Sequence, residues 1–198
     1  MIGDTIRSAR TIEQRRTFLE ELQYFMNKSE AEQAIRLRGR LPDLEEFWQY
    51  RIGTSAVRVV LALNSYCNDL DDVPPEVLKD ADYCSLLDLT NINICAVNDL
   101  LSVKKELAQG AVENLVAILF ASTGSTALAS HGIMEIVRAS KIGFDAKAKQ
   151  FLQRYAFEDD AAHVARRLVE GCKFYSTGNL DWRYVLSCIF RKLTGTHH

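Results

Sequence analysis

The chain has 198 residues, which suits one domain, and 47% hydrophobic with 25% charged residues is ordinary for a soluble globular protein. The formal net charge is −2 and no basic run alternates with aromatic residues, which argues against a nucleic-acid-binding function. No signal-peptide pattern follows Met1, and we find no apolar stretch of the roughly 18 to 20 residues that a membrane span needs. We therefore expect a cytoplasmic protein without a membrane span.

The cysteines follow neither a disulfide pattern nor a zinc-binding pattern. They are odd in number, include no CxxC pair and lie mostly within apolar helical sequence: Cys67, Cys84, Cys95, Cys172 and Cys188. This favours reduced, buried thiols. The final residues, 195–198, resemble the stub of an expression tag, so we expect a single domain over residues 1–194 and assign the terminal histidines no function.

Apolar residues recur with helical period from Thr11 onward, which predicts a first helix there. Ser29 followed by Glu32 resembles a capping box that opens a short helix, and Gly39 is placed to close it. Pro42 then predicts the start of the next helix, because proline is favoured in a first helical turn. Further helices are expected over Thr126 to Ile142, Phe144 to Tyr155 and Asp159 to Tyr175.

The helix that begins near Pro42 contains weak helix formers in a run, Gly53, Thr54 and Ser55, directly after Arg51 and Ile52. A kink or local unwinding at this point would turn backbone carbonyls toward a neighbouring cavity. The alternative is a plain helix break with a solvated arginine.

Three oxygen-bearing side chains, Asn98, Ser102 and Glu106, are spaced four residues apart within the stretch from Asn91 to Leu119. On a helix such residues lie one turn above another on the same face. Their neighbours are largely apolar, and an amide, a hydroxyl and a carboxylate in that setting need partners. Three hard oxygens suit Mg²⁺. The alternative is that the first two satisfy backbone groups while Glu106 is solvated.

The segment NDLLSVKKE closely resembles the second metal-binding motif of class I terpene synthases, (N/D)Dxx(S/T)xxxE. The segments LAQG and ENLVAIL resemble the sequence that usually follows this motif. The resemblance is to microbial sesquiterpene synthases. It implies that Asn98, Ser102 and Glu106 bind one Mg²⁺ and that Lys105 contacts the substrate diphosphate.

Two more segments resemble the same family. LPDLEEFWQYRIGTSA is similar to the helix in which an arginine senses the diphosphate, which implies Arg51 as sensor, Thr54 as linker and Ser55 as effector. YSTGNLDWRYVLSCIFRK is similar to the segment whose arginine and tyrosine close on the diphosphate, which implies that Arg183 and Tyr184 bind substrate. The family leaves several residues between the tryptophan and this pair, whereas here they are adjacent. A structural aromatic end-cap is the alternative.

The aspartate-rich motif with which the family binds two further Mg²⁺ ions has no counterpart. Asp69, Asp71 and Asp72 precede two prolines, Pro74 and Pro75, so we assign them to a loop. The resemblance therefore covers roughly residues 11 to 184 and implies an all-α helical bundle, the later part of the family's fold, truncated or shortened at its N-terminus. A bundle lacking its first helices exposes an apolar wall, so we expect a homodimer or a covering partner.

The resemblance implies an enzyme, a carbon-oxygen lyase that ionises an isoprenoid diphosphate, farnesyl or geranyl, and cyclises the carbocation. Phe47, Trp48 and Phe120 are candidates to stabilise that cation. The alternative is a catalytically silent or partner-dependent protein that binds isoprenoid or diphosphate ligands. The motifs of other enzyme classes, such as the P-loop and HExxH, are absent from the sequence, and lone histidines such as His131 and His163 are expected in core or surface roles.

Overall fold

The structure is a computed structural model that describes residues 11–68, 70 and 73–194, with the backbone alone for residues 183–184 and 186–194. The aspartates assigned to a loop, Asp69, Asp71 and Asp72, and the terminal residues 195–198 lie outside the described residues. The described chain contains helices and no strand, which confirms the all-α prediction. In chain order the helices are α2 (Ile12–Arg36), α3 (Leu44–Thr54), α4 (Val57–Leu61), α5 (Asn64–Cys67), α6 (Pro75–Leu78), α7 (Ala81–Ala108), α8 (Leu115–Thr123), α9 (Thr126–Arg154) and α10 (Asp159–Thr194).

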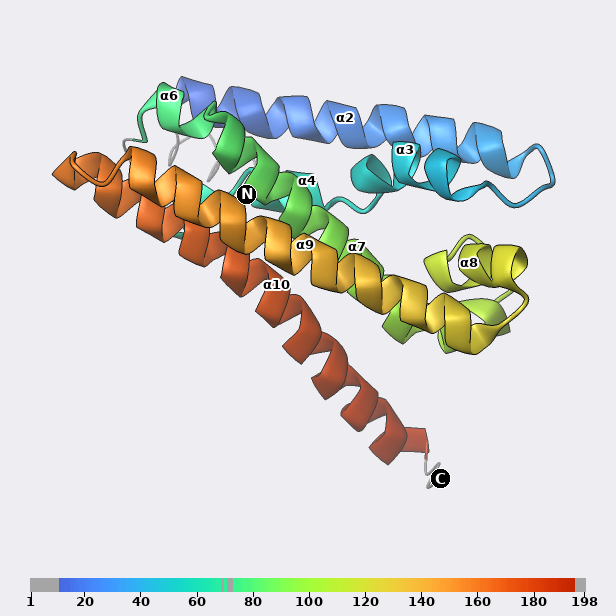
Figure 1. The fold of residues 1–198 in the computed structure, drawn as a ribbon. Coiled ribbons are helices and arrows are strands. Elements are labelled where there is room, and N and C mark those ends of the chain that lie inside the picture. The colour runs from blue at the N-terminus through green and yellow to red at the C-terminus, as the bar shows by residue number, and fades with distance from the viewer. Residues whose placement is uncertain (1–10, 69, 71–72, 195–198) are drawn as a thin grey trace.

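Helix α7 is the centre of the bundle (Figure 1). It packs against α9 along much of its length and also contacts α10, α8, α4 and α3, while α2 packs against α3. Gly143 lies inside α9 where a Cβ atom would come within 3.2 Å of the Leu89 side chain. The missing side chain thus permits the close approach of α9 to α7. The last part of α10 extends beyond the other helices in Figure 1.

Two apolar clusters form the core, one toward each end of α7. The first joins the start of α7 to the end of α9 and to α10, with Leu86, Phe151 and Leu168 fully buried. The second joins α3, the middle of α7, α8 and the start of α9 around Phe47 and Leu115. Because both clusters include α7, that helix is held in place along its whole length.

Several predicted boundaries were wrong. Helix α2 is continuous, and the Ser29 hydroxyl donates to the Phe25 carbonyl at 2.9 Å within it instead of capping a new helix. Helix α3 begins at Leu44, not at Pro42, because Asp43 and Glu46 form a capping box.

The later segments, predicted as separate helices, also join into two long ones. Helix α9 continues through Gly143 to Arg154, and α10 continues through Gly178 to Thr194. Neither glycine has a positive φ, so neither acts as a helix terminator, unlike Gly39 with φ 67. The alternative of an aromatic end-cap at Trp182 does not hold, because the helix runs on past it.

The expectation about membrane spans needs correction. Helix α7, Ala81–Ala108, is long and apolar enough to cross a bilayer by length and composition. It is also the helix around which the bundle packs, and it carries the buried polar side chains of Thr90, Asn91 and Asp99. A core helix of a bundle accounts for the same composition.

The thiols are only partly as predicted. Cys95 and Cys172 are buried, whereas Cys67 and Cys84 are exposed, and all four are unpaired. Burial raises the pKa of Cys95 to about 11 and that of Cys172 to about 12. The side chain of Cys188 lies outside the described residues.

Candidate functional site

The helix break predicted after Arg51 is present. Helix α3 ends at Thr54, Ala56 takes a left-handed φ of 58, and α4 starts at Val57. For a residue with a Cβ this conformation costs about 1 to 2 kcal/mol. The interruption is therefore strained and must be held by its surroundings.

Asn91 of α7, which is fully buried, holds the break in place. Its Nδ2 donates to the Ile52 carbonyl at 2.7 Å, and its Oδ1 accepts from the Ser55 hydroxyl at 3.0 Å. The Ser55 Oγ in turn accepts from the Val57 amide at 3.2 Å. Backbone groups freed by the break thus find partners on α7, which fixes the turn against that helix.

The three predicted metal ligands lie on α7 in one row. The row continues the line of Ile94, which is four residues before Asn98, so all four side chains project from the same face of the helix. Asn98 and Glu106 are half-buried and Ser102 is buried. The Ser102 hydroxyl has no hydrogen-bond partner, which contradicts the alternative that it satisfies a backbone group.

The end of α7 brings the chain back against Glu106. Gly110 has φ 74, which glycine adopts without strain. Its amide donates to the Leu107 carbonyl at 3.0 Å, and the Ala111 amide donates to the Glu106 carbonyl at 2.9 Å. These two bonds close a helix in a Schellman motif. Asn114 then caps α8, and its Nδ2 donates to Oε2 of Glu106 at 2.8 Å.

Arg51 forms an ion pair with Asp99 of α7, which is almost completely buried. Burial acts to lower the pKa of Arg51, but the Asp99 carboxylate together with Cys95 and Glu32 outweighs it and the pKa is raised, so the guanidinium stays charged. Burial also raises the pKa of Asp99, and the charge of Arg51 opposes that effect. The other Asp99 oxygen accepts from the Leu115 amide at 2.9 Å. The alternative of a solvated Arg51 is therefore wrong.

A pocket of about 360 Å³ lies beside the helix break. Its lining is largely apolar and comes from three parts of the chain: Ser55, Ala56, Val57 and Val60 from the break and α4, Ile94 from α7, and Phe174, Tyr175, Gly178, Asn179 and Trp182 from α10. The row of Asn98, Ser102 and Glu106 thus leads away from this pocket along α7. An apolar pocket next to a few polar groups is the usual form of a small-molecule site.

Unsatisfied polar atoms occur at the end of α3, in the polar row of α7 and in the pocket wall. Among the described residues, five buried side-chain nitrogen or oxygen atoms have no hydrogen-bond partner, and three of them belong to the predicted site residues Arg51, Thr54 and Ser102. A fourth is Nδ2 of Asn179, in the pocket wall. Native structures contain few buried polar atoms without a hydrogen-bond partner, so each one needs an explanation. A ligand at this place would supply the missing partners.

The donor set fits a hard divalent cation. Asn98, Ser102 and Glu106 offer an amide oxygen, an unpaired hydroxyl and a carboxylate, which are all ligands that Mg²⁺ accepts. The described residues hold no group of three His, Cys, Asp or Glu arranged for a metal. A metal at this row therefore depends on oxygen ligands with a single carboxylate, and its remaining positions would need water or phosphate oxygens.

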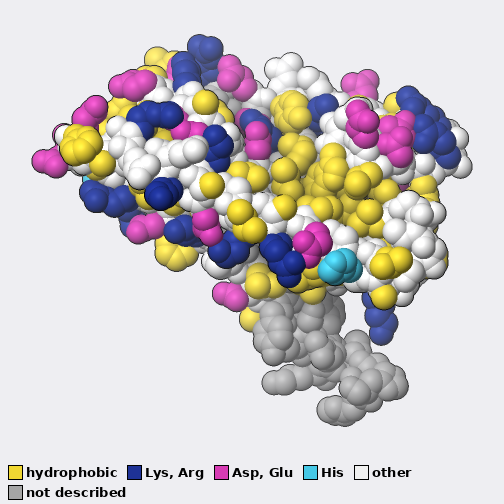
Figure 2. Space-filling model, in the orientation of Figure 1, with side chains coloured by type: hydrophobic (Ala, Val, Ile, Leu, Met, Phe, Trp, Pro, Cys, Tyr) yellow, Lys and Arg dark blue, Asp and Glu magenta, His cyan; other side chains and the backbone are white. Residues whose placement is uncertain are grey.

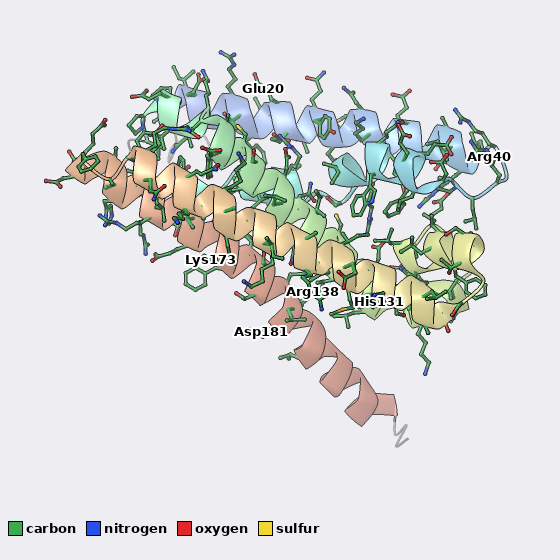
Figure 3. The ribbon with its side chains drawn as sticks, viewed as in Figure 1. Glu20, Arg40, His131, Arg138, Lys173 and Asp181 are labelled. Carbon is green, nitrogen blue, oxygen red and sulfur yellow. The ribbon has the colours of Figure 1, made fainter. Side chains whose placement is uncertain are left out.

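The remaining predicted residues fall in different places. Lys105 is exposed on α7 three residues after Ser102, on a neighbouring part of the same face. Arg183 and Tyr184 belong to α10 directly after Trp182, and their side chains lie outside the described residues. The exposed position of His131 on α9, labelled in Figure 3, agrees with a surface role.

The predicted aromatic residues are not in the pocket. Phe47 is buried in the second core cluster, Trp48 packs against that cluster, and Phe120 is exposed on α8. Helix α10 supplies the aromatic lining instead. Of these aromatic residues, only Trp182 lies beyond the helix that was expected to end at Tyr175; Phe174 and Tyr175 lie within it, and helical periodicity alone does not show which face of α10 borders a pocket.

Three polar residues that support the site, Asn91, Asp99 and Asn114, were not identified from the sequence. Each is almost completely buried. A signal existed for Asn114, because an asparagine directly before the apolar run of residues 115–120 is typical of a helix N-cap. Asp99 stands at the second defined position of the (N/D)Dxx(S/T)xxxE motif, which was a signal for it, whereas for Asn91 a polar residue in an apolar helix was the only available sign.

Comparisons with known proteins agree with this geometry. A family model described as "Terpene synthase family 2, C-terminal metal binding" matches residues 2–138. The sesquiterpene cyclase hepA of Aspergillus oryzae is 31% identical over an alignment that covers 98% of this chain and 54% of that protein. The germacrene A synthase of Nostoc punctiforme is 28% identical, with coverage of 84% and 51%. The chain spans about half the length of these curated relatives.

Solved structures share the fold. The linalool/nerolidol synthase from Streptomyces clavuligerus, crystallised in complex with 2-fluorogeranyl diphosphate, superposes with a TM-score of 0.83 at 20% identity, covering 91% of this chain and 62% of that one. The germacradien-4-ol synthase from Streptomyces citricolor gives a TM-score of 0.74 at 22% identity, with coverage of 90% and 57%. The matched family model and the shared helical fold confirm the resemblance seen in the motifs, and this chain belongs to the terpene synthase family.

Proposed function

We propose that the chain acts as a terpene cyclase that ionises an acyclic isoprenoid diphosphate, farnesyl or geranyl diphosphate, with the help of Mg²⁺. The observation that carries the proposal is the set of buried, unpartnered polar atoms on Arg51 and Thr54, at the end of α3 before the pocket-lining Ser55, and on Ser102, about two turns along α7 from the pocket-lining Ile94. The names of the relatives support a sesquiterpene product and hence a farnesyl substrate. The diphosphate analogue in the similar Streptomyces structure supports the ligand class.

The metal would be held by Asn98, Ser102 and Glu106. When bound, Mg²⁺ would neutralise part of the charge of the departing diphosphate. Arg51 and Lys105 add two cations from the chain itself, and Arg183 with Tyr184 are proposed as further diphosphate contacts. Charges placed in advance where negative charge develops are an effective means of catalysis.

The pocket would receive the hydrocarbon part of the substrate. Its lining is largely apolar, and because Val60, Phe174 and Trp182 are exposed, a closing movement or a covering surface would be needed to keep water from the carbocation. The rings of Phe174, Tyr175 and Trp182 offer π faces to a cation. Ser55 and Ala56, at the break between α3 and α4, line the pocket. Their position supports the proposed roles of Arg51 as sensor, Thr54 as linker and Ser55 as effector.

The proposal is tested by incubating the purified chain with Mg²⁺ and farnesyl diphosphate and measuring volatile terpenes and released inorganic diphosphate. We expect both products from the wild type and a loss of at least about 100-fold in rate for Ser102→Ala. Ser85→Ala is the matched control, because that serine lies on the same helix and its hydroxyl donates to the Ala81 carbonyl at 2.8 Å. Equal rates for the two variants would contradict the assigned role of Ser102.

A second candidate is a catalytically silent or partner-dependent protein that binds isoprenoid or diphosphate ligands. It is favoured by the single carboxylate in the row of Asn98, Ser102 and Glu106. Retained Mg²⁺-dependent binding of inorganic diphosphate without turnover would support this candidate over the first.

We also propose a homodimer or a covering partner. Hydrophobic side chains gather on the face between α3, α8 and α9 in Figure 2, and α9 exposes Leu128, Met134 and Ile142. Exposed apolar surface of this kind favours association. Sedimentation equilibrium measures the expected dimer mass, and a strictly monomeric chain at high concentration would contradict the homodimer.

A further inference from the structure

We propose that Asn114 is a positioning residue that fixes the carboxylate of Glu106 for metal binding, an inference that rests on the proposed function. Asn114 is fully buried and is the N-cap residue directly before α8. Its Nδ2 donates to Oε2 of Glu106 at 2.8 Å and to the Asp99 carbonyl at 2.9 Å, while its Oδ1 accepts from the Val116 amide at 2.9 Å. The side chain thus links the start of α8 to two points on α7.

These partners determine the orientation of the amide. The Val116 amide can only donate, and the Asp99 carbonyl can only accept, so the oxygen of Asn114 must face α8 and the nitrogen must face α7. The same nitrogen then has its second proton directed at the Glu106 carboxylate. No flipped orientation of the amide satisfies all three groups.

Capping of α8 does not by itself account for an asparagine here. A helix N-cap needs one acceptor, and serine or aspartate supplies it equally well. The two donor bonds of Asn114 are additional, and one of them goes to a charged oxygen, which makes it a strong hydrogen bond. The amide of Asn114 therefore makes two hydrogen bonds to α7 that a residue acting only as an N-cap would not make.

The support beneath Asn114 is rigid. The next residue, Leu115, is fully buried in the second core cluster, and its amide donates to Oδ2 of Asp99 at 2.9 Å. Asp99 in turn pairs with Arg51. One buried network therefore joins the arginine proposed to sense the diphosphate with the carboxylate proposed to bind the metal.

The carboxylate of Glu106 is therefore ordered before a metal ion binds. A free glutamate side chain samples several rotamers, and ordering it on metal binding costs free energy. With Oε2 already held by Asn114, that cost falls and Oε1 remains for a metal ion. Hydrogen bonds of this kind to a metal ligand change metal affinity by roughly 10- to 100-fold.

The test compares wild type with Asn114→Ser, which keeps an acceptor for the Val116 amide but removes the amide nitrogen that donates to Glu106 and to the Asp99 carbonyl. Free Mn²⁺ is measured by electron paramagnetic resonance in the presence of inorganic diphosphate, and stability is followed by urea unfolding. Ser125→Ala is the matched control, because Ser125 caps α9 by accepting from the Leu128 amide at 3.4 Å and has no bond to the metal row. We expect a roughly 10- to 100-fold weaker Mn²⁺ affinity for Asn114→Ser and less than a twofold change for Ser125→Ala.

An affinity for Asn114→Ser within twofold of wild type, with wild type binding Mn²⁺, would overturn this inference and leave the proposed function standing. Failure of the wild type to bind Mn²⁺ with diphosphate would overturn both. If Asn114→Ser does not fold, the test uses wild-type protein in ¹⁵N NMR spectra. The side-chain amide signal of Asn114 should shift on addition of Mg²⁺ and diphosphate. A signal that does not move at saturation would overturn the inference.

Discussion

Replacement of Asp99 by asparagine should destabilise the fold because of what the carboxylate holds. Asp99 is 1% exposed, pairs with Arg51, and accepts from the Leu115 amide at 2.9 Å. An asparagine has nearly the same shape but one acceptor oxygen, so one of the two donors loses its partner. The Arg51 side chain is 20% exposed and would remain as a largely buried cation without a counter-charge.

Loss of one partner of a buried ion pair lowers the free energy of unfolding by about 3 to 5 kcal/mol. Because Arg51 keeps some exposure, we expect Asp99→Asn to lose about 3 kcal/mol. For a chain of this length that corresponds to a fall in Tm of about 6 to 12 °C. The assay is urea and thermal unfolding followed by circular dichroism. Asp145→Asn is the control, because its 2.6 Å pair with Lys141 is exposed and should contribute less than about 0.5 kcal/mol. Equal stability of Asp99→Asn and wild type would show that the carboxylate of Asp99 does not stabilise the fold through Arg51.

Further predictions concern the helix break and the thiols. Ala56→Gly should raise the unfolding free energy by about 1 kcal/mol, because glycine relieves the strain of φ 58; a lower Tm than wild type would contradict this. Iodoacetamide at pH 8 should modify Cys67 and Cys84 well before Cys95 and Cys172, as peptide mapping would measure, because only the first two are exposed. Burial raises the pKa of Cys95 from 9.0 to about 11, so the unfolded chain loses this proton first as the pH rises. The stability advantage of wild type over Cys95→Ala should therefore be complete below pH 9 and fall by about 2 to 3 kcal/mol between pH 9 and 11; a pH-independent difference would contradict it.

The sequence predicted those features that local chemistry determines. The spacing of Asn98, Ser102 and Glu106 requires one helix face, and α7 supplies it. The weak helix formers after Arg51 predicted a break, and the left-handed Ala56 marks its place. Gly39 was expected to close a helix; α2 ends at Arg36 with Leu37 as its C-cap, and Gly39 follows in the turn with φ 67.

The errors arose where tertiary packing outweighed local signals. The helix ends expected at Ile142 and Tyr175 lie inside α9 and α10, and the close contact of Gly143 with Leu89 gives that glycine a packing role. The buried pair of Arg51 and Asp99 joins residues 48 positions apart. Such a pair cannot be read from periodicity, because each side chain is polar in sequence and becomes part of the core only after α3 packs on α7.

The most direct test of the metal row is a crystal of the chain grown with Mn²⁺ and inorganic diphosphate and measured for anomalous scattering. The account predicts a peak bonded to Oδ1 of Asn98, Oγ of Ser102 and a carboxylate oxygen of Glu106, at about 2.0 to 2.2 Å from each, the range expected of hard cations of this size. Bound diphosphate with no anomalous peak at this row, or with the metal held by other residues, would contradict it.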